Sequence, residues 1–477
     1  MIIVFSCFTA IILLIATDKL NRALAALVGA IITYFVLFFF EHFDYSIIMP
    51  LLFGSKDDGY INLHTLILII AMMIIIQISI ESGLFQFIAI KLVLLSKGKP
   101  IRLMILFCTL TLILTAVLNN ILAVIILIPL TITVSRILNI NPIPYIMTQA
   151  IIVKLGSTIF LISSITNIMI GTSAGISFVD FFLNVGIISI IIFGFTLIFF
   201  IFLYKKELFI PKGGAEVLKE FDAWNFVPNK RFLIQCSFAL VILIILFIII
   251  PPSILSLDMI ALCVAIVLLI ITRLDPSMII SKIDIELILY LLGIFVVTGA
   301  LEILGFTNFL AILLSNIGGN DILTQILFIL WISAFLSAAI DNIPITKILI
   351  PVVQNMQTTD NYSKSNIRFY SLAIGTCWGD NLTPMGDNIL VMTVSEQNKR
   401  PINFKLFLKI GFITTIYQLA IVSLIFILMF QLILGLIIIS CIMSIILLLY
   451  LIYKFSFTII RVKFDTIITK IRNSIIT

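Results

Sequence analysis

Charge is scarce in this sequence: 11% of the 477 residues are Asp, Glu, Lys or Arg, whereas 62% are hydrophobic. Together with a mean hydropathy of +1.29, this leaves too little polar surface to cover a water-soluble globule. The scarcity excludes a soluble enzyme or a soluble binding domain. We therefore predict an all-α polytopic membrane protein, in which the many Ile, Leu and Phe side chains face lipid.

Histidine is also scarce. Only two histidines occur, His42 and His64, and both flank one predicted loop. The absence of a His-Glu-x-x-His motif argues against a zinc-dependent intramembrane hydrolase, and the absence of a Gly-Lys-Ser/Thr loop argues against a built-in ATPase. The six cysteines lack metal-ligand spacing and are interpreted as reduced packing residues. We predict no enzymatic activity, no catalytic residue and no metal site, with a bound sodium ion as the only candidate cofactor.

Apolar runs of about 20 residues are long enough to cross a bilayer. Runs of roughly this length lie at 1–17, 23–40, 63–81, 176–204, 232–250, 257–272, 283–302, 406–430 and 431–453. Two broken helices, 143–172 and 367–391, are predicted to cross as well, which gives about eleven spans in total. Two re-entrant hairpins, with tips at 119–120 and 341–342, are predicted to enter and leave the membrane on one side.

Polar residues at membrane depth occur twice and in register, which indicates a duplication. Asn120 and Pro129 in the first copy return as Asn342 and Pro351, 222 residues later. Each copy is expected to contain about five spans and one hairpin, in inverted orientation. The predicted division is a first inverted repeat over 1–204, a cytoplasmic linker over 205–231, a second inverted repeat over 232–430, and an extra span with a basic cytoplasmic tail over 431–477.

The distribution of Lys and Arg predicts the orientation, because short loops rich in these residues stay in the cytoplasm. Lys19 and Arg22, the Lys97–Arg102 loop and the linker are therefore placed inside, and the acidic 41–62 loop outside. This puts the N-terminus outside and the C-terminus in the cytoplasm. We expect an integral protein of a prokaryotic plasma membrane.

The hairpin tips and helix breaks are the predicted ion and substrate site. Backbone groups at such interruptions need partners, and helices that start or end there direct partial charges at one point near the midplane. The candidate substrate- and ion-binding residues are Asn119, Asn120, Ser163, Ser164, Thr166, Asn167, Asp341, Asn342, Asn381, Thr383, Pro384, Asp387 and Asn388. The candidate coupling residues are Lys154, Asp341, Asp380 and Asp387.

Charged residues inside these segments have two interpretations each. An ammonium of Lys154 beside Asn120 and Asn167 could replace a coupling sodium ion and exchange protons, or Lys154 could simply pair with a carboxylate. The acids of the second half could carry protons or cations, or Asp341 could form a structural pair with Lys347.

These residues resemble the ion-transporter superfamily, and most closely its branch of arsenite permeases and NhaD-type sodium/proton antiporters, which is related to citrate and dicarboxylate/sodium symporters. The resemblance covers nearly the whole chain and is carried by Leu118-Asn119-Asn120, Asp341-Asn342-Ile343-Pro344 and the stretch from Gly379 to Gly386. It implies a scaffold domain, an elevator-like transport domain, a substrate held between the two tips, and a homodimer. One departure is Ser163-Ser164-Ile165-Thr166-Asn167, where relatives usually carry an acidic Gly-Asp-Pro-Pro-Asn.

The favoured function is secondary active transport of a small inorganic ion, arsenite or a similar oxyanion, coupled to protons. Sodium/proton antiport ranks second. Citrate or dicarboxylate symport ranks third, because the sequence offers no evident Arg fork for two carboxylates. A channel with the same fold is left open. The expected partners are the transported ion, protons or sodium, the lipid bilayer and a second copy of the chain, with no nucleic acid.

Overall fold

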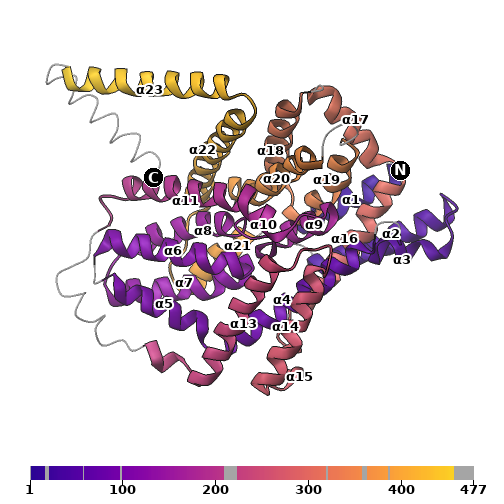
Figure 1. Ribbon diagram of the computed structural model, residues 1–477, viewed down its shortest axis with the longest axis horizontal. Coiled ribbons are helices and arrows are strands. Elements are labelled where there is room, and N and C mark those ends of the chain that lie inside the picture. Colours follow the sequence, from indigo (N-terminus) through magenta and orange to yellow (C-terminus); the bar gives the residue numbers. More distant parts are fainter. Residues whose placement is uncertain are drawn as a thin grey trace.

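The computed structural model is helical wherever it describes regular structure (Figure 1). It describes residues 2–16, 21–56, 59–96, 99–208, 223–318, 321–356, 362–384 and 387–455. Within these residues, nine helices are long and apolar enough to cross a bilayer. The prediction of an all-α polytopic membrane protein is confirmed.

The first half contains long helices, one hairpin and one broken helix. It begins with α1 (Ile2–Ala16), α2 (Arg22–Phe39), α3 (Ile48–Phe53), α4 (Ile61–Glu81) and α5 (Leu84–Leu95). The hairpin is α6 (Pro100–Val117) and α7 (Asn120–Ile137). The broken helix is α8 (Ile143–Gly156), η2 (Leu161–Ser163) and α9 (Ile165–Ala174), and the half ends with α10 (Phe178–Phe181), η3 (Phe182–Gly186) and α11 (Ile187–Leu203).

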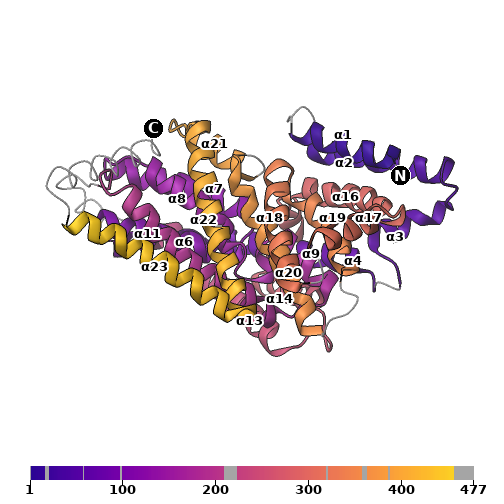
Figure 2. The same cartoon turned by 90° about the horizontal axis from the view of Figure 1, so that it is seen from above.

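The second half repeats this order. After the short η5 (Ala223–Phe226) come α13 (Lys230–Ile249), α14 (Leu257–Thr272), α15 (Pro276–Ile280), α16 (Ile285–Ile303) and α17 (Phe306–Gly318). The hairpin is α18 (Ile322–Ala339) and α19 (Asn342–Asn355). The broken helix is α20 (Tyr362–Gly379), η6 (Asp380–Leu382) and α21 (Asp387–Gln397), followed by α22 (Phe404–Phe430) and by α23 (Leu432–Phe455), which lies along the outer edge of the molecule (Figures 1 and 2).

Equivalent glycines end equivalent helices in the two halves. Gly83 follows α4 with φ +74°, and Gly305 follows α16 with φ +81°. This left-handed conformation favours glycine, because a Cβ atom would clash with the backbone there. At each glycine the chain turns from a long helix into a shorter one, so the sequence repeat is also a repeat of local structure.

The packing of the halves is mirrored across the molecule. Helix α2 packs along α16, and its counterpart α14 packs along α4. In the same way, α7 contacts α21, and its counterpart α19 contacts α9. Figure 2 shows α2 beside α16 at one end of the molecule and α6 and α8 toward the other. Each half therefore completes its packing with elements of the other half.

The observed boundaries follow the predicted ones closely, with one difference. The predicted span 23–40, for example, is observed as α2, Arg22–Phe39. The second broken helix extends over 362–397 rather than 367–391, because the helices continue through the polar residues on either side of the apolar run. Residues 209–222 of the predicted linker and 456–477 of the predicted tail lie outside the described residues. The number of spans, about eleven, stays a prediction, because the hairpin arms α6, α7 and α18 count among the nine long apolar helices.

Helices α2 and α16 cross at very short distance because of a glycine. A Cβ atom added to Gly293 would lie 2.6 Å from the carbonyl carbon of Ala26. Farther along the same two helices, a Cβ atom at Gly29 would lie 3.8 Å from Val297. The contacts advance together along both helices, so α2 and α16 run in the same direction.

This crossing predicts a strong effect of Gly293→Val on stability. The added side chain has to displace the backbone of α2, and we expect a loss of at least about 1–3 kcal/mol, as for other overpacked sites. The measurement is thermal unfolding of the purified protein in detergent. Gly194→Ala is the matched control, because a Cβ atom at Gly194 meets nothing within 4 Å. Equal unfolding temperatures for the two variants would contradict the close crossing.

Candidate functional site

The two hairpin tips are short extended turns between helices. In the first tip, Leu118 and Asn119 adopt extended backbone angles, and the Asn119 side chain accepts a hydrogen bond of 2.9 Å from the N–H of Leu122. This cap satisfies one of the free N–H groups at the start of α7. In the second tip, Asp341 precedes α19 in a similar extended conformation. Both tips therefore present a helix N-terminus.

Both tips face one cavity. Its volume is about 30 Å³ and it opens to solvent. The space between the tips therefore has room for about two water-sized groups and is smaller than the about 300–1,000 Å³ typical of small-molecule sites. From the tips and the first helix break it is lined by Asn119, Asn120, Ile121, Ser163, Ser164, Ile165, Asp341, Asn342 and Ile343. Two further lining residues, Arg22 and Leu287, come from the first turns of α2 and α16. Six of the predicted site residues are thus brought together.

The electrostatics of the cavity combine positive and negative groups. Three helices, α7, α9 and α19, begin at its wall, and helix N-termini carry partial positive charge that favours anions. Arg22 adds a full positive charge, and Asp341 adds a carboxylate that accepts a hydrogen bond of 2.9 Å from the Tyr290 hydroxyl. The guanidinium of Arg22 also lies 3.5 Å from Glu286 and 3.8 Å from Asp284. The site can hold an anion and a proton or cation together.

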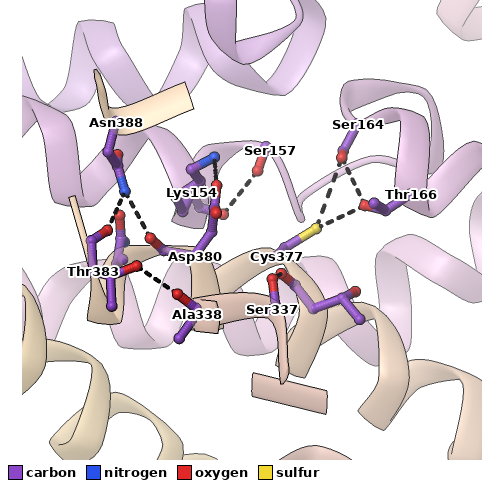
Figure 3. A network of polar contacts seen from close by, with 12 residues as sticks. Lys154, Ser157, Ser164, Thr166, Ser337, Ala338, Cys377, Asp380, Thr383 and Asn388 are labelled. Carbon is purple, nitrogen blue, oxygen red and sulfur yellow. Dashed lines mark hydrogen bonds and ion pairs between the residues drawn. The ribbon is translucent and has the colours of Figure 1, made fainter. Parts of the chain in front are cut away.

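A buried ion pair lies next to the helix breaks (Figure 3). Lys154 of α8 and Asp380 of η6 form a salt bridge, and their exposed fractions are 0% and 2%. Neither residue lines the cavity. Of the two interpretations of Lys154, the structure shows the pairing with a carboxylate: its ammonium contacts Asp380 of the other half, because an unpaired charge at this depth would be far more costly.

Four predicted ligands, among them the lining residue Ser163, bond backbone carbonyls of the helix breaks and of the hairpin arms, in two mirrored pairs. The Asn167 amide donates to the carbonyl of Ser157 at 2.8 Å, and the Asn388 amide donates to the carbonyl of Asp380 at 2.7 Å. The hydroxyls of Ser163 and Thr383 donate to the carbonyls of Ala116 and Ala338, at 2.5 and 2.7 Å. These bonds hold each broken helix against its hairpin.

The remaining predicted residues lie behind the cavity wall. Asn381 donates to the carbonyl of Ile151 at 3.1 Å, and the Thr166 hydroxyl lies 2.8 Å from that of Ser164 and 3.1 Å from the thiol of Cys377 (Figure 3). Pro384 is buried and is not part of the lining. The side chain of Asp387 lies outside the described residues. Six predicted site residues therefore do not line the cavity: Thr166, Asn167, Asn381, Thr383, Pro384 and Asn388.

Sequence reasoning missed three residues of the site. Arg22 was interpreted only as an orientation signal, and Leu287 and Tyr290 as ordinary residues of an apolar run. Arg22 directly follows Asn21, which caps α2 with its side chain, so the capping signal could have placed this cation at a helix start. Arg22 places one guanidinium in the lining, which the search for an Arg fork did not find. Tyr290 belongs to the site through its bond to Asp341. Lys347, the alternative partner proposed for Asp341, donates to Asn62 at 2.6 Å.

Comparison with known proteins identifies the family. A family model described as "Citrate transporter", CitMHS, matches residues 12–375. The chain belongs to the CitMHS family. This agrees with the resemblance to the ion-transporter superfamily, and the CitMHS chain is accordingly a membrane transporter rather than an enzyme.

Similar proteins span bacteria and mammals. The "46 kDa membrane protein" of Mycobacterium leprae is 27% identical over 428 residues, which cover 88% of this chain and 96% of that protein. An "uncharacterized transporter" of Synechocystis is 24% identical over 444 residues, covering 87% and 95%. The "P protein" of Sus scrofa is 24% identical over 436 residues, covering 74% of this chain and 51% of that protein.

The buried ion pair predicts a stability cycle. Asp380→Asn or Lys154→Met alone leaves the partner charged and buried, and each should cost about 3–5 kcal/mol, whereas the double variant should recover most of this loss. Thermal unfolding of the detergent-solubilised proteins measures it. The control is Glu81→Gln, which removes the partly exposed pair between Glu81 and Lys282 and should cost about 0–1 kcal/mol. Additive losses in the double variant would show that the two residues do not act as a pair.

Proposed function

We propose that this chain is a secondary active carrier of a small oxygen-rich anion, which binds in the cavity between the hairpin tips. The observation that carries the proposal is the convergence of Arg22 and three helix N-termini on one cavity that also contains Asp341. Such amide and guanidinium donors recognise carboxylates and oxyanions. Serine and asparagine side chains in the same lining can hydrogen-bond the remaining oxygens.

Among such anions we propose a citrate-like carboxylate first and arsenite or a similar inorganic oxyanion second. Arg22 offers one guanidinium donor to a carboxylate, and the family's description supports the same order. If arsenite or a similar oxyanion is the substrate, the chain is proposed to belong to the branch of arsenite permeases and NhaD-type antiporters. Sodium/proton antiport ranks third and is favoured by one feature, the carboxylate of Asp341 in the lining.

Protons are the proposed coupling ion. The buried salt bridge between Lys154 and Asp380 joins α8 of one half to η6 of the other. Moving one proton onto Asp380 removes its charge and weakens this link. The proposal thereby connects proton binding to the relative position of elements that surround the helix breaks.

Alternating access is proposed to be elevator-like. The parallel helices α2 with α16 and α4 with α14 form the scaffold in this proposal, and the hairpins with the broken helices form the transport domain. The same proposal includes an inverted orientation of the two halves, an N-terminus outside, a C-terminus in the cytoplasm, and a homodimer.

Transport itself is measured with the purified full chain in proteoliposomes. We expect citrate, or failing that arsenite, to accumulate when a pH gradient is imposed without sodium, and counterflow of preloaded solute to accelerate uptake. Empty liposomes are the control. Accumulation that requires a sodium gradient would overturn proton coupling, and movement without counterflow would indicate a channel.

The anion-binding role predicts the effect of Arg22→Gln. Loss of a charged donor costs about 1.5–3 kcal/mol, so we expect the KM for the anion to rise about 10- to 100-fold, with folding retained. The control is Arg136→Gln, which removes an exposed arginine in the last turn of α7 and should leave the KM unchanged. An Arg22→Gln carrier with unaltered KM would place the anion elsewhere.

A further inference from the structure

We infer that the scaffold has a second corner for the substrate cavity, formed by His64, Thr65 and Asp258, and that this corner faces the bound anion when the carrier opens to the opposite side. We call it the second corner, and the residues Arg22, Glu286 and Leu287 the first corner. The inference rests on the proposed function and extends it to a conformation that differs from the one described above.

The two corners occupy equivalent positions in the repeat. His64 and Thr65 lie 222 residues before Glu286 and Leu287, the same separation that relates Asn120 to Asn342 at the hairpin tips. They belong to the first turn of α4, just as Glu286 and Leu287 belong to the first turn of α16. Each of these helices packs along its partner, α14 or α2, from the other half.

Each corner also contains a contact between an acidic and a basic side chain, made between equivalent pairs of helices. In the first corner, Arg22 of α2 lies 3.5 Å from Glu286 of α16. In the second corner, Asp258 of α14 lies 2.9 Å from His64 of α4. The acid and the base have exchanged helices, so the pairing is preserved while the charge is redistributed.

The cavity meets only the first corner. Arg22 and Leu287 line it, whereas His64, Thr65 and Asp258 do not. The two halves are equivalent, but only one of the two corners meets the cavity. The structure therefore corresponds to one of two conformations, and in the other conformation the halves exchange roles. In the exchanged conformation, the tips lie against Thr65 as they now lie against Leu287.

Equivalent threonines of α9 and α21 show the same asymmetry. Thr172 in the last turn of α9 covers the second corner, with its hydroxyl 2.8 Å from that of Thr65. Its counterpart within α21 is Thr393, since Asn167 and Asn388 make equivalent bonds five residues earlier. Thr393 is exposed, whereas Thr172 is partly buried. Exchange of the conformations therefore uncovers the second corner and covers the first.

The corners differ in the groups that they offer to an anion. In the first corner, Arg22 lies near Glu286 and Asp284. In the second corner, a charged group that faces His64 is Asp258 of α14, and α9 contributes the uncharged Thr172 beside it. The ion pair between Glu81 and Lys282 lies at the opposite end of α4. The first corner therefore offers a guanidinium to the anion, and the second offers an imidazole.

Cross-linking tests the exchanged conformation directly. In the full chain with the exposed Cys263 and Cys441 replaced by Ser, Ile343→Cys combined with Leu287→Cys should react with a short bifunctional thiol reagent, as the observed cavity requires. Ile343→Cys combined with Thr65→Cys should react as well, in a fraction of molecules that changes when citrate or a pH gradient is added. Reaction of the Leu287 pair alone under all conditions would overturn the inference.

Sided transport tests the role of His64. In oriented proteoliposomes, His64→Gln should raise the KM about tenfold for uptake from the side that the second corner faces, whereas His64→Arg, which gives this corner the guanidinium of the first, should leave that KM low. The KM from the other side should not change. His42→Gln, at the other histidine of the chain, is the control. Equal effects on both sides would contradict the inference, whereas an inactive wild-type carrier would contradict the proposed function instead.

Discussion

The fold depends on one constraint: a helix that is interrupted inside a membrane has to find partners for its free carbonyl and N–H groups. Here the carbonyls at the two breaks are bonded by Asn167 and Asn388, and those near the ends of the hairpin arms by Ser163 and Thr383. Because these side chains are committed to the backbone, the tips and the break are rigidly placed. Two of these four bonds join a break to its hairpin, and they thereby fix how the walls of the cavity lie relative to one another.

The salt bridge between Lys154 and Asp380 adds specificity to this frame. A pair of opposite charges in a low dielectric environment tolerates few alternative arrangements, since any displacement leaves a charge without its partner. It joins residues 226 positions apart, one from each half. The salt bridge therefore fixes the position of one half relative to the other, and the hairpin tips of both halves reach the same cavity.

The sequence was sufficient for the repeat, the tips and most helix limits, because interruptions of long apolar runs by Asn, Gly and Pro are local signals. It did not predict which polar residues line the cavity and which bond the backbone. Asn120 and Asn167 have the same chemistry, yet one lines the cavity and the other bonds a carbonyl. That difference, like the position of Arg22 beside Asp341, arises from contacts between helices that are far apart in the chain, and no local pattern encodes it.

The unequal corners of the scaffold have a consequence for the energetics of the transport cycle. A carrier cannot alter the steady-state concentration ratio that its coupling ion sustains, because any change in affinity on one face is balanced by the free energy of reorientation. An arginine at one face and a histidine at the other therefore leave the ratio unchanged. In the proposed cycle they set the rate in each direction, so forward and reverse transport would differ in speed although the final concentration ratio would be the same.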